Sequence, residues 1–228
     1  MSKWIALMIT LAAAATLPAQ TAAGTIQATG TATLSVNPDQ ASIDVSVITQ
    51  GTTAQQAAQL NAAQTTTVIN ALKQLLGSNG TVQTVSYSVD PRYSNTSVQS
   101  NTIIGYTATN TVRATTSDLT QVGPLIDTAN QAGAGSVGNL SFTLQNPDSY
   151  QQQALSAAAK QAQAYASAIA TGLGSKTGAV VSAQQGASTS YPILAGLAGG
   201  VASSVPTPVQ TGMVTVAATV TITVQLLQ

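Results

Sequence analysis

The stretch YSVDPRYSNTS, residues 87–97, holds two of the chain's six tyrosines, one of its two arginines and one of its six aspartates. Asp90 offers a carboxylate, Arg92 a guanidinium, and Tyr87 and Tyr93 two phenols. An enzyme acting on small oxidised metabolites or on wall fragments could use Asp90, Arg92 and Tyr87. Catalysis would require a base with a shifted pKa in a pocket that excludes water, whereas this segment precedes a polar loop. We therefore interpret it as a strand end and assign no catalytic residue.

The composition removes most other catalytic chemistry. The 228 residues include no cysteine and no histidine, so thiolate nucleophiles, imidazole bases and the commonest transition-metal ligands are missing. Charged residues make up 5% of the chain and the formal net charge is zero, so no basic patch exists to hold phosphates. An enzyme is therefore disfavoured, no cofactor or metal is expected, and nucleic acid is not expected as a partner.

The other charged or unusual residues are interpreted as structural. Asp44 lies on the polar face of an alternating strand and is expected to be solvated. Arg113, Lys160 and Lys176 are expected to point to solvent. Gly105 interrupts a strand and is expected to mark a bulge.

Two kinds of motif match are too unspecific to indicate a functional site. The sequence GSNG, residues 77–80, lacks the lysine and hydroxyl residue of a phosphate-binding loop, so it predicts a turn. Asn79, Asn95 and Asn139 each match the N-glycosylation triplet, which is frequent in any chain rich in Asn and Thr.

The N-terminus is typical of an export signal. Lys3 supplies a positive start, WIALMITLAAAAT supplies a short apolar run at residues 4–16, and small residues follow. Cleavage after Ala19 or Ala23 would fit. The apolar run is shorter than the roughly 20 residues needed to span a bilayer. We predict a signal peptide at residues 1–23, a mature chain in the periplasm or envelope, and no transmembrane span.

The elements that must position any site follow from hydrophobic periodicity. Alternation of apolar and polar residues predicts strands, and three- and four-residue spacing predicts helices. The predicted strands cover residues 25–36, 41–49, 81–93, 102–116, 136–146, 178–187 and 212–227. The predicted helices cover residues 52–77, 117–134 and 146–174.

Local signals refine the helices. Thr52 with Gln55 predicts a capping box, and Gly77 predicts the end of the first helix. Ser117 is the expected cap of the second helix, and Gly123–Pro124 predicts a kink in it. The third helix is expected to begin at Asn146, with these residues facing inward: Leu155, Ala158, Ala162, Tyr165, Ile169 and Leu173.

This order predicts an α+β fold, with one mixed, mostly antiparallel sheet and about three helices packed on it. The triplet NPD, residues 37–39, is expected to connect the first two strands as a hairpin. Residues 188–211 are rich in Gly, Ser and Pro and are expected to form a flexible loop within a single domain, residues 24–228. Strict alternation of apolar residues at even positions makes residues 212–227 the expected main strand of the core.

Several short motifs occur together in a known order. They are ATGTATLSVNPDQASIDVSV, VQTVSYSVDPRY, IIGYTATNTVRATTSDL, VGPLIDTANQAGA and the alanine-rich QQQALSAAAKQAQAYASAIATGLG. In this set the chain resembles the SIMPL family of bacterial exported proteins, which includes periplasmic oxidative stress defence proteins and surface antigens. The resemblance implies an α+β fold, export, self-association and a role in stress tolerance, and it implies no catalytic residues.

Three functions follow as hypotheses. The first is a non-enzymatic envelope module that self-assembles into a homo-oligomer or binds other envelope proteins, because the closing strand needs pairing along its length. The second is the enzyme described above. The third is a surface adhesin whose contacts come from two loops, residues 94–101 and 188–211.

Overall fold

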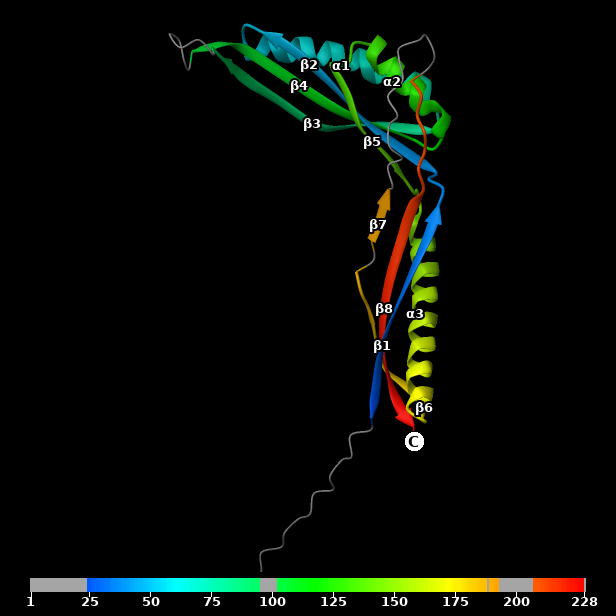
Figure 1. The fold of residues 1–228 in the computed structure, drawn as a ribbon. Coiled ribbons are helices and arrows are strands. Elements are labelled where there is room, and N and C mark those ends of the chain that lie inside the picture. The colour runs from blue at the N-terminus through cyan, green and yellow to red at the C-terminus, as the bar shows by residue number, and fades with distance from the viewer. Residues whose placement is uncertain (1–23, 95–101, 188, 193–206, 228) are drawn as a thin grey trace, which may run out of the picture.

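The molecule is elongated and has two parts, which we name the head and the stalk (Figure 1). The structure is a computed structural model that describes residues 24–94, 102–187, 189–192 and 207–227. The head contains strands β2–β5 and helices α1 and α2, and the stalk contains β1, β6, β7, β8 and helix α3. The predicted signal peptide lies outside the described residues.

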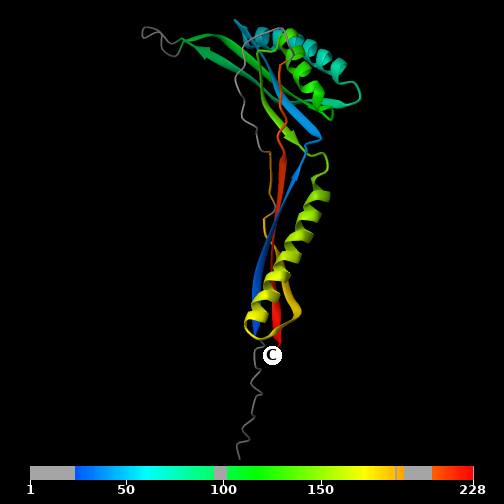
Figure 2. The same ribbon diagram turned by 45° about the vertical axis from the view of Figure 1, so that its right-hand side comes forward.

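The stalk is an antiparallel sheet with one long helix on one face (Figures 1 and 2). The sheet order is β1-β8-β6, and β7 pairs with β8 beyond the end of β6. The elements are β1 Thr25–Val36, α3 Pro147–Gly172, β6 Lys176–Gln185, β7 Thr189–Pro192 and β8 Val214–Leu227.

Strand β8 is the centre of the stalk, as its alternation predicts. Its even positions from Val214 to Val224 are buried, and the intervening residues are half-buried. It pairs with β1 along twelve residues without a register shift, and with β6 and β7 on its other side. The pairing that this strand needs is therefore supplied within one chain.

Helix α3 packs on the stalk sheet through alanines. Ala154 and every fourth residue from it, up to Ala170, are buried. The small face lets the backbones approach closely, because a Cβ on Gly30 of β1 would lie 2.1 Å from the carbonyl oxygen of Ala158. The prediction of larger inward residues was wrong for Tyr165, Ile169 and Leu173, which are exposed.

The head is a second antiparallel sheet, of order β3-β4-β2-β5, with both of its helices on one face. Val45, Val68 and Leu125 come from β2, α1 and α2 and meet in its main core. The elements are β2 Gln40–Gly51, α1 Ala54–Leu76, β3 Gly80–Tyr93, β4 Ile103–Thr116, a 3-10 turn Leu119–Gln121, α2 Val122–Gln131 and β5 Ser136–Thr143.

A buried amide joins α1 to the head sheet. Asn61 is fully buried, and its Nδ2 donates to the carbonyl oxygens of Val47 at 2.9 Å and Ala108 at 3.1 Å. Thr65 Oγ1 donates to Asn61 Oδ1 at 3.2 Å. Because these partners lie on β2, β4 and α1, the amide sets where the helix sits on the sheet.

The helix ends differ from the sequence predictions by small steps. Thr53 caps α1, its Oγ1 accepting from the amide of Gln56, so the predicted box is shifted by one residue. Gly77 ends α1 with a positive φ, as predicted. A cap by Ser117 was wrong, because Asp118 caps the 3-10 turn instead. Pro124 falls in the first turn of α2, where its missing N–H is not needed, so the second helix begins there rather than kinking.

The α+β class and the three helices are confirmed, but the strands form two sheets rather than one. The predicted hairpin at residues 37–39 was wrong, because β1 pairs with β8 while β2 pairs with β4 and β5. The chain crosses there from stalk to head, and Asp39 Oδ1 accepts from the amide of Gln145 at 2.7 Å. Of the predicted loop 188–211, residues 189–192 form β7, and residues 188 and 193–206 lie outside the described part.

Candidate functional site

The three side chains of the enzyme hypothesis lie on the outer strand of the head. Tyr87, Asp90 and Arg92 are exposed on β3. Tyr87 pairs with Asn110 and Asp90 with Thr107, so strand alternation puts Tyr87 on the helix-covered face and the two charged residues on the other face. The structure therefore does not bring the three side chains together.

The neighbouring residues of this arm are structural. Arg92 Nη1 donates to Gln50 Oε1 of β2, reaching across β4. The pairing register of β3 with β4 shifts between Arg92 and Tyr93, next to Gly105, where a bulge was predicted. Residues 95–101, including Asn95, lie outside the described part, so the adhesin hypothesis for this loop stays a prediction.

A charged cluster that the sequence did not predict lies on the helix-free face of the head. Asp44 on β2 and Arg113 on β4 are directly opposite in the register. Arg113 donates from Nε to Oδ1 of Asp44 at 2.7 Å and from Nη2 to Oδ2 at 2.9 Å. Asn139 of β5 donates from Nδ2 to Oδ2 at 3.1 Å. The carboxylate thus joins three neighbouring strands.

Asn139 reaches Asp44 because of a local backbone feature. The register of β2 with β5 shifts between Ser42 and Asp44, and Asn139 has φ 51°, the left-handed region that asparagine tolerates. This bulge turns the amide towards the carboxylate.

Electrostatics at the cluster follow from these contacts. The hydrogen bonds from Arg113 lower the pKa of Asp44, against the effect of burial, and the hydrogen bond from Asn139 adds to the lowering. The same pair raises the pKa of Arg113. Asp44 is 8% exposed, so the prediction of a solvated carboxylate was wrong. Arg113 was predicted to point to solvent, and half of its side chain is exposed. The cluster is thus an ion pair with one amide partner, and it joins β2, β4 and β5.

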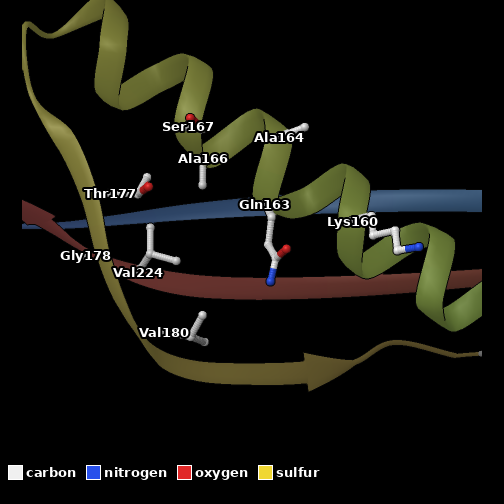
Figure 3. A pocket seen from close by; sticks show the side chains of 9 residues that line it. All are labelled: Lys160, Gln163, Ala164, Ala166, Ser167, Thr177, Gly178, Val180 and Val224. Atoms are coloured by element: carbon white, nitrogen blue, oxygen red, sulfur yellow. The ribbon is translucent and has the colours of Figure 1, made fainter.

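A groove runs between α3 and β6 in the stalk (Figure 3). Its volume is about 450 Å³, and its lining includes Lys160, Gln163 and Ser167 of α3 and Thr177 and Val180 of β6. Lys160 is exposed there as predicted, and it supplies the groove's single charge. Lys176 is exposed at the start of β6.

A smaller groove of about 290 Å³ lies at the end of α1 that carries the predicted turn. Its lining includes Ser78, Asn79 and Ser117, without a charged side chain. The backbone oxygen of Asn79 accepts from the amide of Ser117 at 2.9 Å, so this turn closes a joint between α1 and β4.

Exposed apolar side chains gather on the stalk beside β1. Tyr165, Ile169 and Leu173 are 50%, 44% and 64% exposed. They continue a row at four-residue spacing from Gln161, whose Oε1 accepts from the backbone amide of Thr31 on β1 at 2.6 Å. The row therefore runs along the outer side of β1, an edge strand. A sequence signal for the orientation of α3 was available, because alanine recurs at every fourth position on its buried face. The exposed row lies beside that face.

Within the described residues no group of His, Cys, Asp and Glu could hold a metal ion. In the same part of the chain no helix is both long and apolar enough to cross a bilayer. The described strand edges with exposed apolar side chains beside them include β1 with its apolar row and β3 with Tyr87.

Comparison with known proteins identifies a family for nearly all of the described chain. The model of the SIMPL family, described as "Protein of unknown function (DUF541)", matches residues 26–224. The chain belongs to the SIMPL family. The match begins in β1 and ends in β8, so head and stalk together make up the SIMPL unit.

Two relatives of this SIMPL chain carry the name "26 kDa periplasmic immunogenic protein". One comes from Brucella melitensis biotype 1 and the other from Brucella abortus strain S19. Each is 27% identical over 126 residues, which is 54% of this chain and 50% of the relative. The match thus spans half the length of these curated relatives.

Proposed function

We propose that this SIMPL protein is an exported, non-enzymatic module of the periplasm or cell envelope that acts by self-assembly or by binding, in a role linked to stress tolerance. Periplasmic location is supported by the name of the Brucella relatives and by the apolar run after Lys3. The link to stress and the predicted homo-oligomer rest on the family resemblance.

The observation that carries the proposal is the presence of strand edges with exposed apolar side chains beside them. β1 and β3 are outer strands of their sheets, and each lies beside exposed apolar side chains. Backbone groups of an edge strand bind an added strand, and adjacent apolar side chains strengthen the contact. β8 gives no such support, because it is paired on both sides.

Sedimentation of the mature protein across a range of concentrations tests self-assembly. We expect species larger than a monomer as the concentration rises. A monomer at every concentration would contradict self-assembly. Only binding to other envelope proteins would then remain, and capture of a defined partner would be needed to support it.

The enzyme hypothesis makes a different prediction. Asp90→Ala and Arg92→Ala are expected to leave the secondary structure intact, because both side chains are exposed. On our proposal the two variants change stability or assembly only, because both residues lie on the outer strand β3. Loss of a measurable turnover in both variants, with the fold retained, would favour the enzyme instead.

A further inference from the structure

We propose that two copies of this chain join antiparallel along the free edge of β1, with the Tyr165–Ile169–Leu173 row of one α3 packed against the same row of the other. The occupant of this surface is thus a second copy. The inference rests on the self-assembly in the proposed function and gives it a defined interface.

The backbone of β1 is open for pairing on its outer side. The amide of Leu226 donates to the carbonyl oxygen of Gly24 at 2.7 Å. In an antiparallel pair the inward groups alternate, so the even residues of β1 bond β8 and the odd residues point outward. The hydrogen bond from the Thr31 amide to Gln161 agrees with this alternation, because Thr31 is an odd residue and its amide points away from β8. The outward backbone groups of Thr25, Gln27 and Thr29 have no partner among the described residues.

β1 lacks the usual protection of an edge strand. Soluble proteins guard such edges with charges, prolines, bulges or covering segments. β1 contains no charged residue and no proline, and its register with β8 is unbroken. Gln161 covers the edge at Thr31. The stretch from Thr25 to Thr29 lies beyond this contact, at the end of β1 away from the head, and it is the accessible part beside the apolar row.

The apolar row lies level with this accessible part. Gln161 contacts Thr31, which fixes one common point of helix and strand. Moving four residues along β1 to Gln27 covers about 13 Å at about 3.3 Å per residue. The same distance along α3, at about 1.5 Å per residue, reaches Ile169. Tyr165 is then level with Thr29, and Leu173 with Thr25.

A second copy fits the helix as well as the strand. α3 lies over both β1 and β8, since its alanines pack with Ile26 and Ala28 of one and with Ile222 and Val224 of the other. Joining β1 to β1 of a second copy puts two strand spacings between the helix axes, about 10 Å. Packed helices lie about 8–10 Å apart, so the two copies of α3 come into contact.

One two-fold axis satisfies both contacts. If Gln27 lies opposite its counterpart in the second copy, Thr25 pairs with the counterpart of Thr29. The same axis places Ile169 against its own counterpart, and Tyr165 against Leu173 of the second copy. A foreign strand could pair with the edge but would bring no helix to cover the row, which is why a second copy fits better.

Charge and area are compatible with a reversible dimer. The charged residues of α3 are Asp148 and Lys160, and Lys160 lines the groove on the β6 side. No like charges therefore meet across the axis. The strand edge and three side chains from each copy would bury roughly 1,000 Å² in total, near the lower limit for specific interfaces. Association is thus expected to depend on concentration.

The first experiment is sedimentation of the mature protein and of Ile169→Glu across concentration. The substitution puts two carboxylates against each other, so the Kd of the dimer should rise at least about tenfold. Leu60→Glu is the matched control, because Leu60 is 49% exposed on α1 of the head. It should assemble as the wild type does. An unchanged Kd for Ile169→Glu, or an equal effect of both variants, would overturn the interface.

The second experiment tests the antiparallel arrangement. Leu173→Glu alone should weaken the dimer, because a charge then faces Tyr165 of the second copy. Adding Tyr165→Lys on the same chain gives each copy a cation opposite a carboxylate and should restore the dimer. Failure of the double variant to recover, with circular dichroism unchanged, would argue against this orientation.

The third experiment uses the absence of cysteine from the chain. Gln27→Cys should form a disulfide-linked dimer under oxidising conditions, since Gln27 meets its own counterpart. Ser35→Cys, at the head end of the same strand, should remain unlinked.

The outcomes separate this inference from the proposed function. Oligomers that persist in Ile169→Glu and link through residue 35 would keep self-assembly and overturn the β1 interface. A wild-type monomer at all concentrations would overturn the β1 interface and self-assembly together. A monomer that binds an extended peptide at this edge would also overturn the dimer, but it would support the binding part of the proposed function.

Discussion

Asp44 was predicted to be solvated, but in the structure it is buried and bound to Arg113. In a chain with twelve charged residues, two of them meet across β2 and β4 at 2.7 Å. Because Asp44 is buried and Arg113 is half exposed, the two partners are not equivalent. Removing the cation leaves a buried carboxylate without its main partner, whereas removing the carboxylate leaves the guanidinium in contact with water.

We predict that Arg113→Met destabilises the protein more than Asp44→Asn does. The expected loss in the free energy of unfolding is about 1–2 kcal/mol for Asp44→Asn, and the loss for Arg113→Met should exceed it. Urea unfolding followed by circular dichroism measures both. Lys160→Met, which removes an exposed charge from the stalk, serves as the control and should change stability little. Equal losses in the two head variants would contradict the asymmetry.

The lowered pKa of Asp44 predicts an acid dependence of stability. A carboxyl group with a folded-state pKa below its unfolded value stabilises the fold above the unfolded value, about 3.9. That stabilisation is lost as the pH falls through the folded-state pKa. Unfolding between pH 7 and pH 2 should therefore show a decline below about pH 4 that is smaller in Asp44→Asn. Identical pH profiles for the two proteins would remove Asp44 as the cause.

At the scale of elements, the contact of α3 with β1 depends on small residues from both sides. A Cβ on Gly30 would lie 2.1 Å from the oxygen of Ala158 and 2.5 Å from the nitrogen of Ala162. Both are backbone atoms of a helix, so no side-chain rotation can relieve the clash. The row of alanines on α3 and Gly30 on β1 together allow the helix and strand backbones to approach closely.

Gly30→Ala is therefore expected to push α3 away from the sheet and destabilise the stalk by about 1–3 kcal/mol. Gly138→Ala in β5 is the matched control, because a Cβ there meets nothing within 4 Å. Hydrogen exchange should show faster exchange of β8 amides in the first variant and wild-type rates in the second. Wild-type exchange in both would contradict the close approach.

At the scale of the whole molecule, the head and the stalk have cores of their own, joined where the chain crosses between them. One crossing segment is residues 207–213, before β8. Thr207 Oγ1 donates to Asp127 Oδ1 of α2 at 2.7 Å, and a Cβ on Gly123 would lie 2.6 Å from the Thr207 oxygen. Val209 packs with Val122 and Phe142. The segment thus ties the central strand of the stalk to a helix of the head.

Asp127→Ala is predicted to loosen this tie. Loss of the hydrogen bond from Thr207 should reduce stability by about 1 kcal/mol and speed exchange of the amides in residues 207–213. Asp148→Ala, an exposed carboxylate in the first turn of α3, is the control. Unchanged exchange in residues 207–213 would show that packing of Val209 holds the segment without the carboxylate.

The sequence alone determined the class and the long elements, because strand alternation and helix spacing are local and strong here. Strand β7 was missed, since it lies in the segment predicted as a loop. The closing strand from Val214 to Leu227 and the ends at Gly77 and Pro147 came from such signals. What only the tertiary structure decided was pairing and orientation. Whether β1 joins β2 or β8, and whether Asp44 meets water or Arg113, depends on register between segments far apart in the chain. Alanine-rich α3 has almost no hydrophobic contrast, so its larger apolar residues were wrongly predicted to face inward. The close approach to Gly30 admits only the row of alanines at every fourth position.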